Sequence, residues 1–202
     1  FLTKSKPKGG KLKRAALSTL FLAWAFTSGL LVRSDPARAC TSAVVAARAS
    51  SDGRALLWKH RDSRHQHNEV VLRDDGKYLY VGVVNAGDEA GREIWMGVNE
   101  AGLAVMNTAS DDLAKPDPEL PKDGEGRLLK VILQSCATVG DVERLLELTD
   151  PGGRDVTTNI GVIDARGGAA YFEVGQQSYK KYDVTRPEVA PRGYLIRTNF
   201  AY

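Results

Sequence analysis

Cys40 stands at the junction between a segment typical of a secretory leader and a chain with the pattern of a folded domain. A basic cluster and the apolar run Ala15–Val32 come first, and the small residues Ala37 and Ala39 match the positions that a signal peptidase reads. Cleavage after Ala39 would make Cys40 the first residue of the mature chain. The sequence therefore predicts a leader over residues 1–39, followed by one domain.

A cysteine at a free N-terminus carries a thiol and an α-amine on the same residue. The reference pKa is about 8.5 for the thiol and about 7.7–8.0 for the amine, so the amine can take the thiol proton. The thiolate is the attacking form, and an N-terminal amine is a known means of activating a nucleophile in cis. We therefore expect removal of the leader to turn Cys40 into a nucleophile.

Two other interpretations of the leader stay open. The run Ala15–Val32 could just span a bilayer and anchor the chain, since about 17–25 apolar residues suffice. A lipoprotein signal would also place a cysteine at the cut, although Arg38 fits its small-residue pattern poorly. The chain starts with Phe1 and stops within a predicted strand at Tyr202, so we expect it to be a fragment.

Removal of the leader changes the charge of the protein. The whole chain has 28 basic and 25 acidic residues, a formal charge of +3, and residues 1–39 contain eight of the basic and one of the acidic residues. Residues 40–202 then keep 20 basic and 24 acidic residues, a formal charge of −4. They contain no basic run interleaved with aromatic residues, so we expect no nucleic-acid partner.

A predicted hairpin brings a charged segment back to Cys40. Thr41–Ala49 is small and β-branched, Ser50–Gly53 has turn residues, and Arg54–Trp58 is apolar again. Residues whose numbers sum to about 103 should face each other, which sets Cys40 within a residue or two of Asp62. A carboxylate there can hold the α-amine, and a nearby cation would lower the pKa of the thiol.

The Cys-Thr-Ser start, the glycine turn and a strand ending in basic-x-x-Asp resemble the cysteine N-terminal nucleophile hydrolases. These include choloylglycine hydrolases, penicillin V acylases, acid ceramidase-type amidases and the isopenicillin-N acyltransferase group, and Leu56–Asp62 is most similar to the bacterial acyltransferase-like branch. The resemblance implies an α+β fold, a four-layer αββα sandwich truncated here at the C-terminus, and cleavage of linear amide C–N bonds. It also implies a cation near the thiol, for which Lys59 and Arg61 are the two candidates.

Two asparagines extend this resemblance. Asn99–Leu103 is similar to the family's Asn-Glu-x-Gly-Leu hairpin, and the strand after it leads to Asn107, which the resemblance implies is an oxyanion-hole residue. The strand Gly193–Phe200 ends in Thr-Asn, which implies a catalytic or polarising role for Asn199. An amide N–H aimed at an oxyanion contributes about 2.7–4 kcal/mol in measured cases. A strand-end cap is the structural alternative for Asn107.

The rest of the domain alternates between strand, turn and helix patterns. Helical spacing predicts helices over Arg127–Ala137 and Asp141–Leu148. Three prolines predict an exposed loop over Leu113–Asp123 that could contact substrate. Further strands are predicted at Tyr78–Val84, Glu93–Gly97, Ala104–Thr108, Asn159–Asp164, Ala169–Val174 and Tyr179–Val184.

Cysteine and histidine usage leaves two more interpretations to weigh. A disulfide between Cys40 and Cys136 is an alternative in an exported chain, and it would abolish the nucleophile. The histidines His60, His65 and His67 cluster in sequence but lack the regular spacing of metal ligands. We therefore expect neither a metal site nor a cofactor.

Together these features predict an exported hydrolase or acyltransferase, periplasmic or extracellular, that cleaves a small-molecule N-acyl amide through a thioester acyl-enzyme. Membrane contact is expected only through an uncleaved leader, and a homo-oligomer is left open. The alternative function is a non-catalytic exported or membrane-anchored binding protein on the same sandwich. The predicted catalytic residues are Cys40, Lys59, Arg61, Asp62, Asn107 and Asn199.

Overall fold

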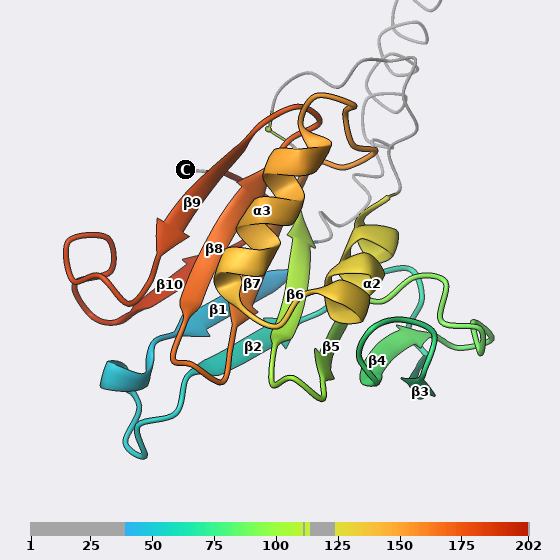
Figure 1. Cartoon of the computed structure of the whole chain (residues 1–202), viewed down its shortest axis with the longest axis horizontal. Coiled ribbons are helices and arrows are strands. Elements are labelled where there is room, and N and C mark those ends of the chain that lie inside the picture. Colours follow the sequence, from blue (N-terminus) through green and yellow to red (C-terminus); the bar gives the residue numbers. More distant parts are fainter. Residues whose placement is uncertain (1–38, 111, 114–123, 202) are drawn as a thin grey trace, which may run out of the picture. The chain divides into compact units, whose positions relative to one another are not determined.

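The computed structural model describes residues 39–110, 112–113 and 124–201, which form two antiparallel sheets and two α-helices (Figure 1). In this part of the chain, the smaller sheet has the strand order β10 (Tyr194–Arg197), β1 (Thr41–Val45) and β2 (Leu56–His60). The helices are α2 (Glu125–Ser135) and α3 (Val139–Thr149). The larger sheet follows chain order through β3 (Asn68–Arg73), β4 (Tyr80–Asn85), β5 (Met96–Asn99), β6 (Ala104–Ala109), β7 (Thr158–Ile163), β8 (Ala169–Val174) and β9 (Tyr179–Asp183).

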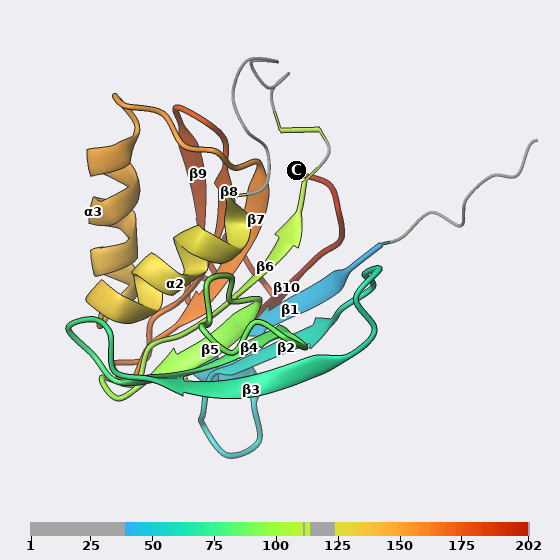
Figure 2. The ribbon, with the colours of Figure 1, turned by 90° about the vertical axis from the view of Figure 1, so that its right-hand side faces the viewer.

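Both helices cover one face of the larger sheet, and the smaller sheet lies against its other face (Figure 2). Leu129 and Leu146 from the helices pack with Phe172 in the first core. Val44 of β1 packs with Tyr171 in a second core between the sheets. This helix–sheet–sheet arrangement is the predicted α+β sandwich, and the described residues form three of the four layers of the αββα form.

The hairpin β1–β2 forms as predicted, but its register differs by two residues. Thr41 faces His60 and Val45 faces Leu56, so paired residue numbers sum to 101. The connection is longer than a tight turn because a short 3-10 helix, Ala47–Ala49, forms within it. A shift of two leaves each side chain on its predicted face, since side chains alternate along a strand with a period of two.

The predicted turn after β5 is anchored to the end of α2. Gly102 has a φ of +83°, in the region that glycine adopts most readily. The Asn99 side chain accepts the Leu103 N–H at 3.0 Å and donates to the carbonyl oxygens of Leu133 and Cys136 at 2.9 and 2.8 Å. These bonds satisfy carbonyl groups that would otherwise lack partners at the helix end, so this asparagine is structural.

Both predicted helices are present with ends shifted by one or two residues. The start of α3 is set by a capping box, in which the Thr138 side chain accepts the Asp141 N–H and the Asp141 carboxylate accepts the Thr138 N–H. The strand β3 is absent from the sequence predictions. It is an edge strand whose Val70 and Leu72 are exposed, so no clean alternation marks it.

The disulfide alternative is wrong, because Cys40 and Cys136 are both free. Cys136 is 3% exposed and belongs to the core between the helices and the larger sheet. Cys40 instead lies half-buried just before β1. The two thiols therefore have separate surroundings.

Two sequence predictions fall outside the described residues. One is the leader, of which only Ala39 is described, and the other is the loop Leu113–Asp123, of which only Leu113 is described. Within the described ranges, no helix is both long enough and apolar enough to cross a membrane.

Candidate active site

A pocket of about 480 Å³ lies where the start of β1, the end of β2 and strand β6 come together. Cys40 precedes β1, and its neighbour β2 carries or leads into the three charged candidates, whereas β6 belongs to the other sheet. Packing of the two sheets thus brings together segments that are distant in sequence. The pocket is lined by all six predicted catalytic residues, Cys40, Lys59, Arg61, Asp62, Asn107 and Asn199, whose roles stay predictions.

Asp62 contacts the chain on both sides of the predicted cut. The Cys40 Sγ lies 3.6 Å from the Asp62 carbonyl oxygen. The Asp62 carboxylate accepts the peptide N–H of Ala39 at 3.2 Å. In the continuous chain, the carboxylate is therefore one residue away from the nitrogen that cleavage would convert into the α-amine.

Lys59 is the cation directed between the two sheets. Along β2, Leu57 and Lys59 are less exposed than their neighbours. The Lys59 ammonium donates to the Trp95 carbonyl at 3.0 Å and to Asn107 Oδ1 at 2.9 Å. Burial lowers the pKa of Lys59 to about 8, and the negative charge of the Cys40 thiolate opposes this effect. Lys59 therefore keeps most of its charge at neutral pH and loses it in mildly alkaline solution.

The contact with Lys59 sets the orientation of the Asn107 amide. A lysine ammonium only donates hydrogen bonds, so the amide oxygen of Asn107 faces it. The amide nitrogen is on the opposite side and donates to Thr158 Oγ1 at 3.4 Å. Because an amide nitrogen carries two N–H bonds, one remains for a ligand. Asn107 is 4% exposed, so this donor would act in a largely water-excluded place.

Asn199 reaches the pocket because the segment after β10 is tied to the larger sheet. Thr108 donates to the Thr198 carbonyl at 2.9 Å, and Asn159 donates to the Phe200 carbonyl at 3.0 Å. The Asn199 amide nitrogen donates to the Ala109 carbonyl at 3.1 Å. A second N–H of this amide is available, as in Asn107.

Arg61 is held by the start of β3 and the end of β4 beside the pocket. It donates to Asn68 Oδ1 at 2.6 Å and to Asn85 Oδ1 at 2.7 Å, and its guanidinium lies 4.8 Å from the centre of the Trp95 ring. Burial lowers the pKa of Arg61, and the charge of Cys40 opposes this effect. Both predicted cations thus interact electrostatically with Cys40, and both remain candidates.

Sequence reasoning missed Trp95, which positions both cations through its carbonyl and its ring. It also missed Glu93 and Glu125, which line the same pocket. A tryptophan within an apolar strand pattern reads as core, so no local signal could have identified its role. Among the described residues, no group of three or more His, Cys, Asp or Glu side chains is placed to hold a metal ion.

Comparison by sequence finds neither a matching family model nor a matching curated protein. Comparison by structure finds similar folds among solved proteins. One is an N-acylethanolamine-hydrolyzing acid amidase ortholog from Caenorhabditis elegans, 16% identical with a TM-score of 0.56. Another is a mutant of the conjugated bile acid hydrolase from Clostridium perfringens, also 16% identical, with a TM-score of 0.50.

The matches cover most of this chain but less of the other proteins. The first covers 81% of this chain and 71% of the amidase, and the second covers 78% of this chain and 52% of the bile acid hydrolase. The chain therefore spans only about half of the bacterial enzyme. At this identity, the comparison concerns the fold. The chain has the fold of the cysteine N-terminal nucleophile hydrolases, as its sequence predicts.

Proposed function

We propose that this protein cleaves a linear amide C–N bond of a small molecule through Cys40, after removal of residues 1–39. The observation that carries the proposal is the pocket itself, in which a half-buried thiol lies with a half-buried lysine ammonium and two asparagine amides. An amide hydrolase needs a nucleophile and donors for the oxyanion, and these side chains offer both.

The proposed reaction begins when the Cys40 α-amine takes the thiol proton. The thiolate attacks the amide carbonyl carbon, and the tetrahedral oxyanion accepts hydrogen bonds from the amide N–H groups of Asn107 and Asn199. The C–N bond then breaks, the leaving amine takes the proton from the α-ammonium, and a thioester remains on Cys40. Water releases the acid, or a second amine accepts the acyl group, with the α-amine again carrying the proton.

Lys59 and Asp62 would act on the groups that react. The positive charge of Lys59 favours the thiolate over the thiol, and its hydrogen bond to Asn107 turns that amide so that its nitrogen is available to the substrate. Asp62 would hold the α-amine, since its carboxylate already binds the adjacent peptide N–H. Arg61 would supply a second positive charge near the sulfur.

Export belongs to the same proposal. Residues 1–39 would direct the chain to the periplasm or the outside of the cell, and their removal would expose Cys40 as the α-amine-bearing nucleophile. The N-terminus of the exported protein, measured by intact mass, should then be Cys40. Any other mature N-terminus would contradict this mechanism. It is the result expected of the alternative, a binding protein that does not carry out the reaction.

The central test compares Cys40→Ala with Cys136→Ala on a panel of N-acyl amides. Each variant loses one thiol, but Cys136 is buried in the core away from the pocket. We expect Cys40→Ala to abolish turnover and Cys136→Ala to retain it, with circular dichroism showing that both are folded. Turnover by folded Cys40→Ala at the wild-type rate would reject the proposal.

A further inference from the structure

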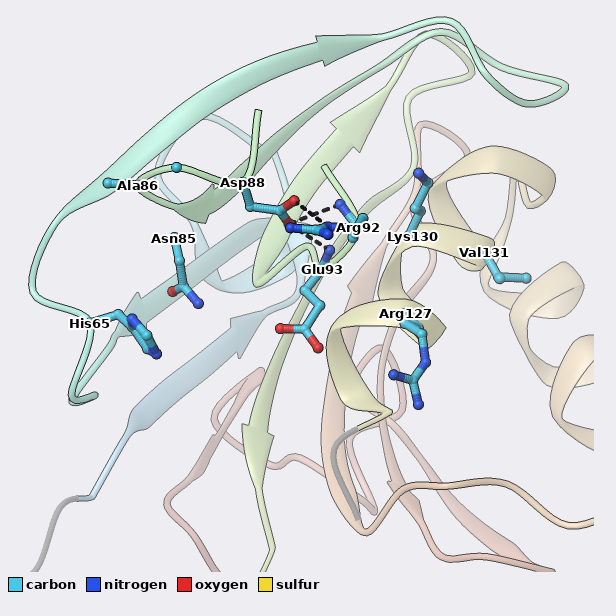
Figure 3. A pocket seen from close by; sticks show the side chains of 10 residues that line it. His65, Asn85, Ala86, Asp88, Arg92, Glu93, Arg127, Lys130 and Val131 are labelled. Carbon is cyan, nitrogen blue, oxygen red and sulfur yellow. Dashed lines mark hydrogen bonds and ion pairs between the residues drawn. The ribbon is translucent and has the colours of Figure 1, made fainter. Parts of the chain in front are cut away.

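A second pocket, of about 810 Å³, adjoins the candidate active site and lies against α2 (Figure 3). His65, Asn85 and Glu93 line both pockets, so the two spaces are direct neighbours. An amide whose carbonyl carbon lies at Cys40 could therefore extend one end into the second space. We call it the α2 pocket, lined by His65, Asn85, Ala86, Gly87, Asp88, Arg92, Glu93, Arg127, Lys130 and Val131.

Most of the described residues that line the α2 pocket have polar or charged side chains. Ala86 and Val131 are apolar, and the aliphatic parts of the longer side chains add further apolar surface. Transfer of an alkyl chain from water to apolar surroundings lowers its free energy. Here the chain would also cover charged groups, and their loss of hydration raises the free energy. A polar end of the substrate could instead form hydrogen bonds with these charged groups.

Glu93 differs from the other charged residues of the α2 pocket. Its carboxylate has no hydrogen-bond or ion-pair partner among the described residues, and it extends into the space between His65 and Arg127 (Figure 3). The remaining carboxylate and the cations are paired. These pairs are Arg92–Asp88 at 3.1 Å, Lys130–Asp75 at 2.8 Å and Arg127–Asp155 at 3.3 Å.

The backbone of Glu93 is firmly held. Its N–H donates to the Asp88 carboxylate at 3.0 Å. The next residue, Ile94, is completely buried and donates its N–H to the Gly126 carbonyl at 3.0 Å. A Cβ on Gly126 would lie 2.7 Å from the Cβ of Glu93, so α2 packs directly against this residue. Glu93 thus presents a carboxylate without a partner from a fixed position.

We propose that Glu93 is a specificity-determining residue that binds a primary ammonium group of the substrate. The substrates are then polar amides with an ammonium on the end that occupies the α2 pocket, rather than amides of simple fatty acids. Hydrogen bonds from an ammonium to a carboxylate are roughly twice as strong as neutral ones. The inference rests on the proposed function only in placing the amide at Cys40, because binding to Glu93 needs no turnover.

The test measures how two ligands protect Cys40 from iodoacetamide, with modification of Cys40 followed by peptide mass spectrometry. The ligands are 6-aminohexanamide and hexanamide, which differ in the terminal ammonium. They are compared in wild type, Glu93→Gln and Glu89→Gln. Glu89 is an exposed residue of the same loop outside both pocket linings, so Glu89→Gln makes the same charge change elsewhere.

In wild type and Glu89→Gln, 6-aminohexanamide should half-protect Cys40 at a concentration about tenfold lower than hexanamide requires. The reason is that a hydrogen bond between charged groups is stronger than a neutral one. In Glu93→Gln the two ligands should protect equally. Equal protection in wild type, no protection by either ligand, or a preference that persists in Glu93→Gln would overturn the inference. A Glu93-dependent preference without amide turnover would instead support the binding site and reject the proposed function.

Discussion

Arg154 is a buried cation and Lys59 a half-buried one, and the groups around them balance the charge differently. Arg154 lies near the end of α3 and is 6% exposed. Its guanidinium donates to the Leu146 carbonyl at 2.7 Å and to the Gly175 carbonyl at 3.0 and 3.2 Å, and it pairs with Asp150 at 2.5 Å. These acceptors neutralise and satisfy the charge, which ties α3 to the turn after β8.

Lys59 has fewer partners in its pocket. Its ammonium donates to a carbonyl and to an amide oxygen, and burial lowers its pKa to about 8. Arginine stays charged at any ordinary pH and has five donors, whereas a buried lysine can lose its proton. The comparison teaches that the α3 corner, where Arg154 joins the end of α3 to the turn after β8, uses its cation for stability. In the pocket at Cys40, the protonation of Lys59 can instead change with pH.

The largest expected effect is the loss of folding stability when Arg154 at the α3 corner is replaced. Arg154→Met should lower the free energy of unfolding by about 3–5 kcal/mol, because it leaves Asp150 and several carbonyl groups without their partner. Urea denaturation measures this change, and Arg166→Met, at an exposed turn, is the control with the same loss of charge. The iodoacetamide reactivity of Cys40 in folded Arg154→Met should match wild type. A slower reaction would show that the two regions are coupled.

The next effect concerns the partner of Lys59. Asn107→Asp keeps an acceptor for the ammonium but removes the amide N–H, so kcat/KM should fall by about 100–1,000-fold, the effect of losing one oxyanion donor. Alkylation of Cys40 should change much less, since it needs no oxyanion donor. The control is Gln177→Glu, which makes the corresponding amide-to-carboxylate exchange at an exposed residue outside the pocket lining. Unchanged turnover in Asn107→Asp would make Asn107 a structural cap.

The smallest effect is a shift in pH dependence. In wild type, activity should decline as pH rises through about 8, because Lys59 loses the proton that favours the thiolate. Lys59→Arg keeps the positive charge, so its alkaline decline should move to higher pH even if its maximal rate is lower. Lys181→Arg, paired with Glu143 away from the pocket, should behave as wild type. Identical alkaline limbs in wild type and Lys59→Arg would assign the decline to another group.

Local pattern predicts most elements of the larger sheet and both helices. The strand Ala169–Val174 has the predicted bounds, and the turn at Asn99–Leu103 is present as expected. The misses occur where local signals are weak. The edge strand β3 leaves Val70 and Leu72 exposed, and the β1–β2 register depends on residues within a long connection.

The residues of the candidate site also differ in how far local sequence pattern predicts them. The approach of Asp62 to Cys40 was predictable, because a hairpin brings its two ends together. Asn107 and Asn199 entered only through a family resemblance, since no local pattern links them to the thiol. The roles of Trp95 and Glu93 could not be predicted, because they depend on how α2 and the two sheets pack.

The sequence by itself determined the chemical groups available to this protein, namely a thiol behind a predicted leader, cations and a carboxylate at the end of the next strand, and two asparagine amides. Only the tertiary structure decided how far these groups are buried, which hydrogen bonds they make and how their pKa values shift. Val44 and Leu57 of the smaller sheet pack in one core with Met106 of β6, which brings β2 close to β6. That approach buries Lys59, lowers its pKa and turns the amide of Asn107. The physical reason is that strand pairing follows from local pattern, whereas burial and hydrogen-bond geometry depend on contacts between segments far apart in the chain.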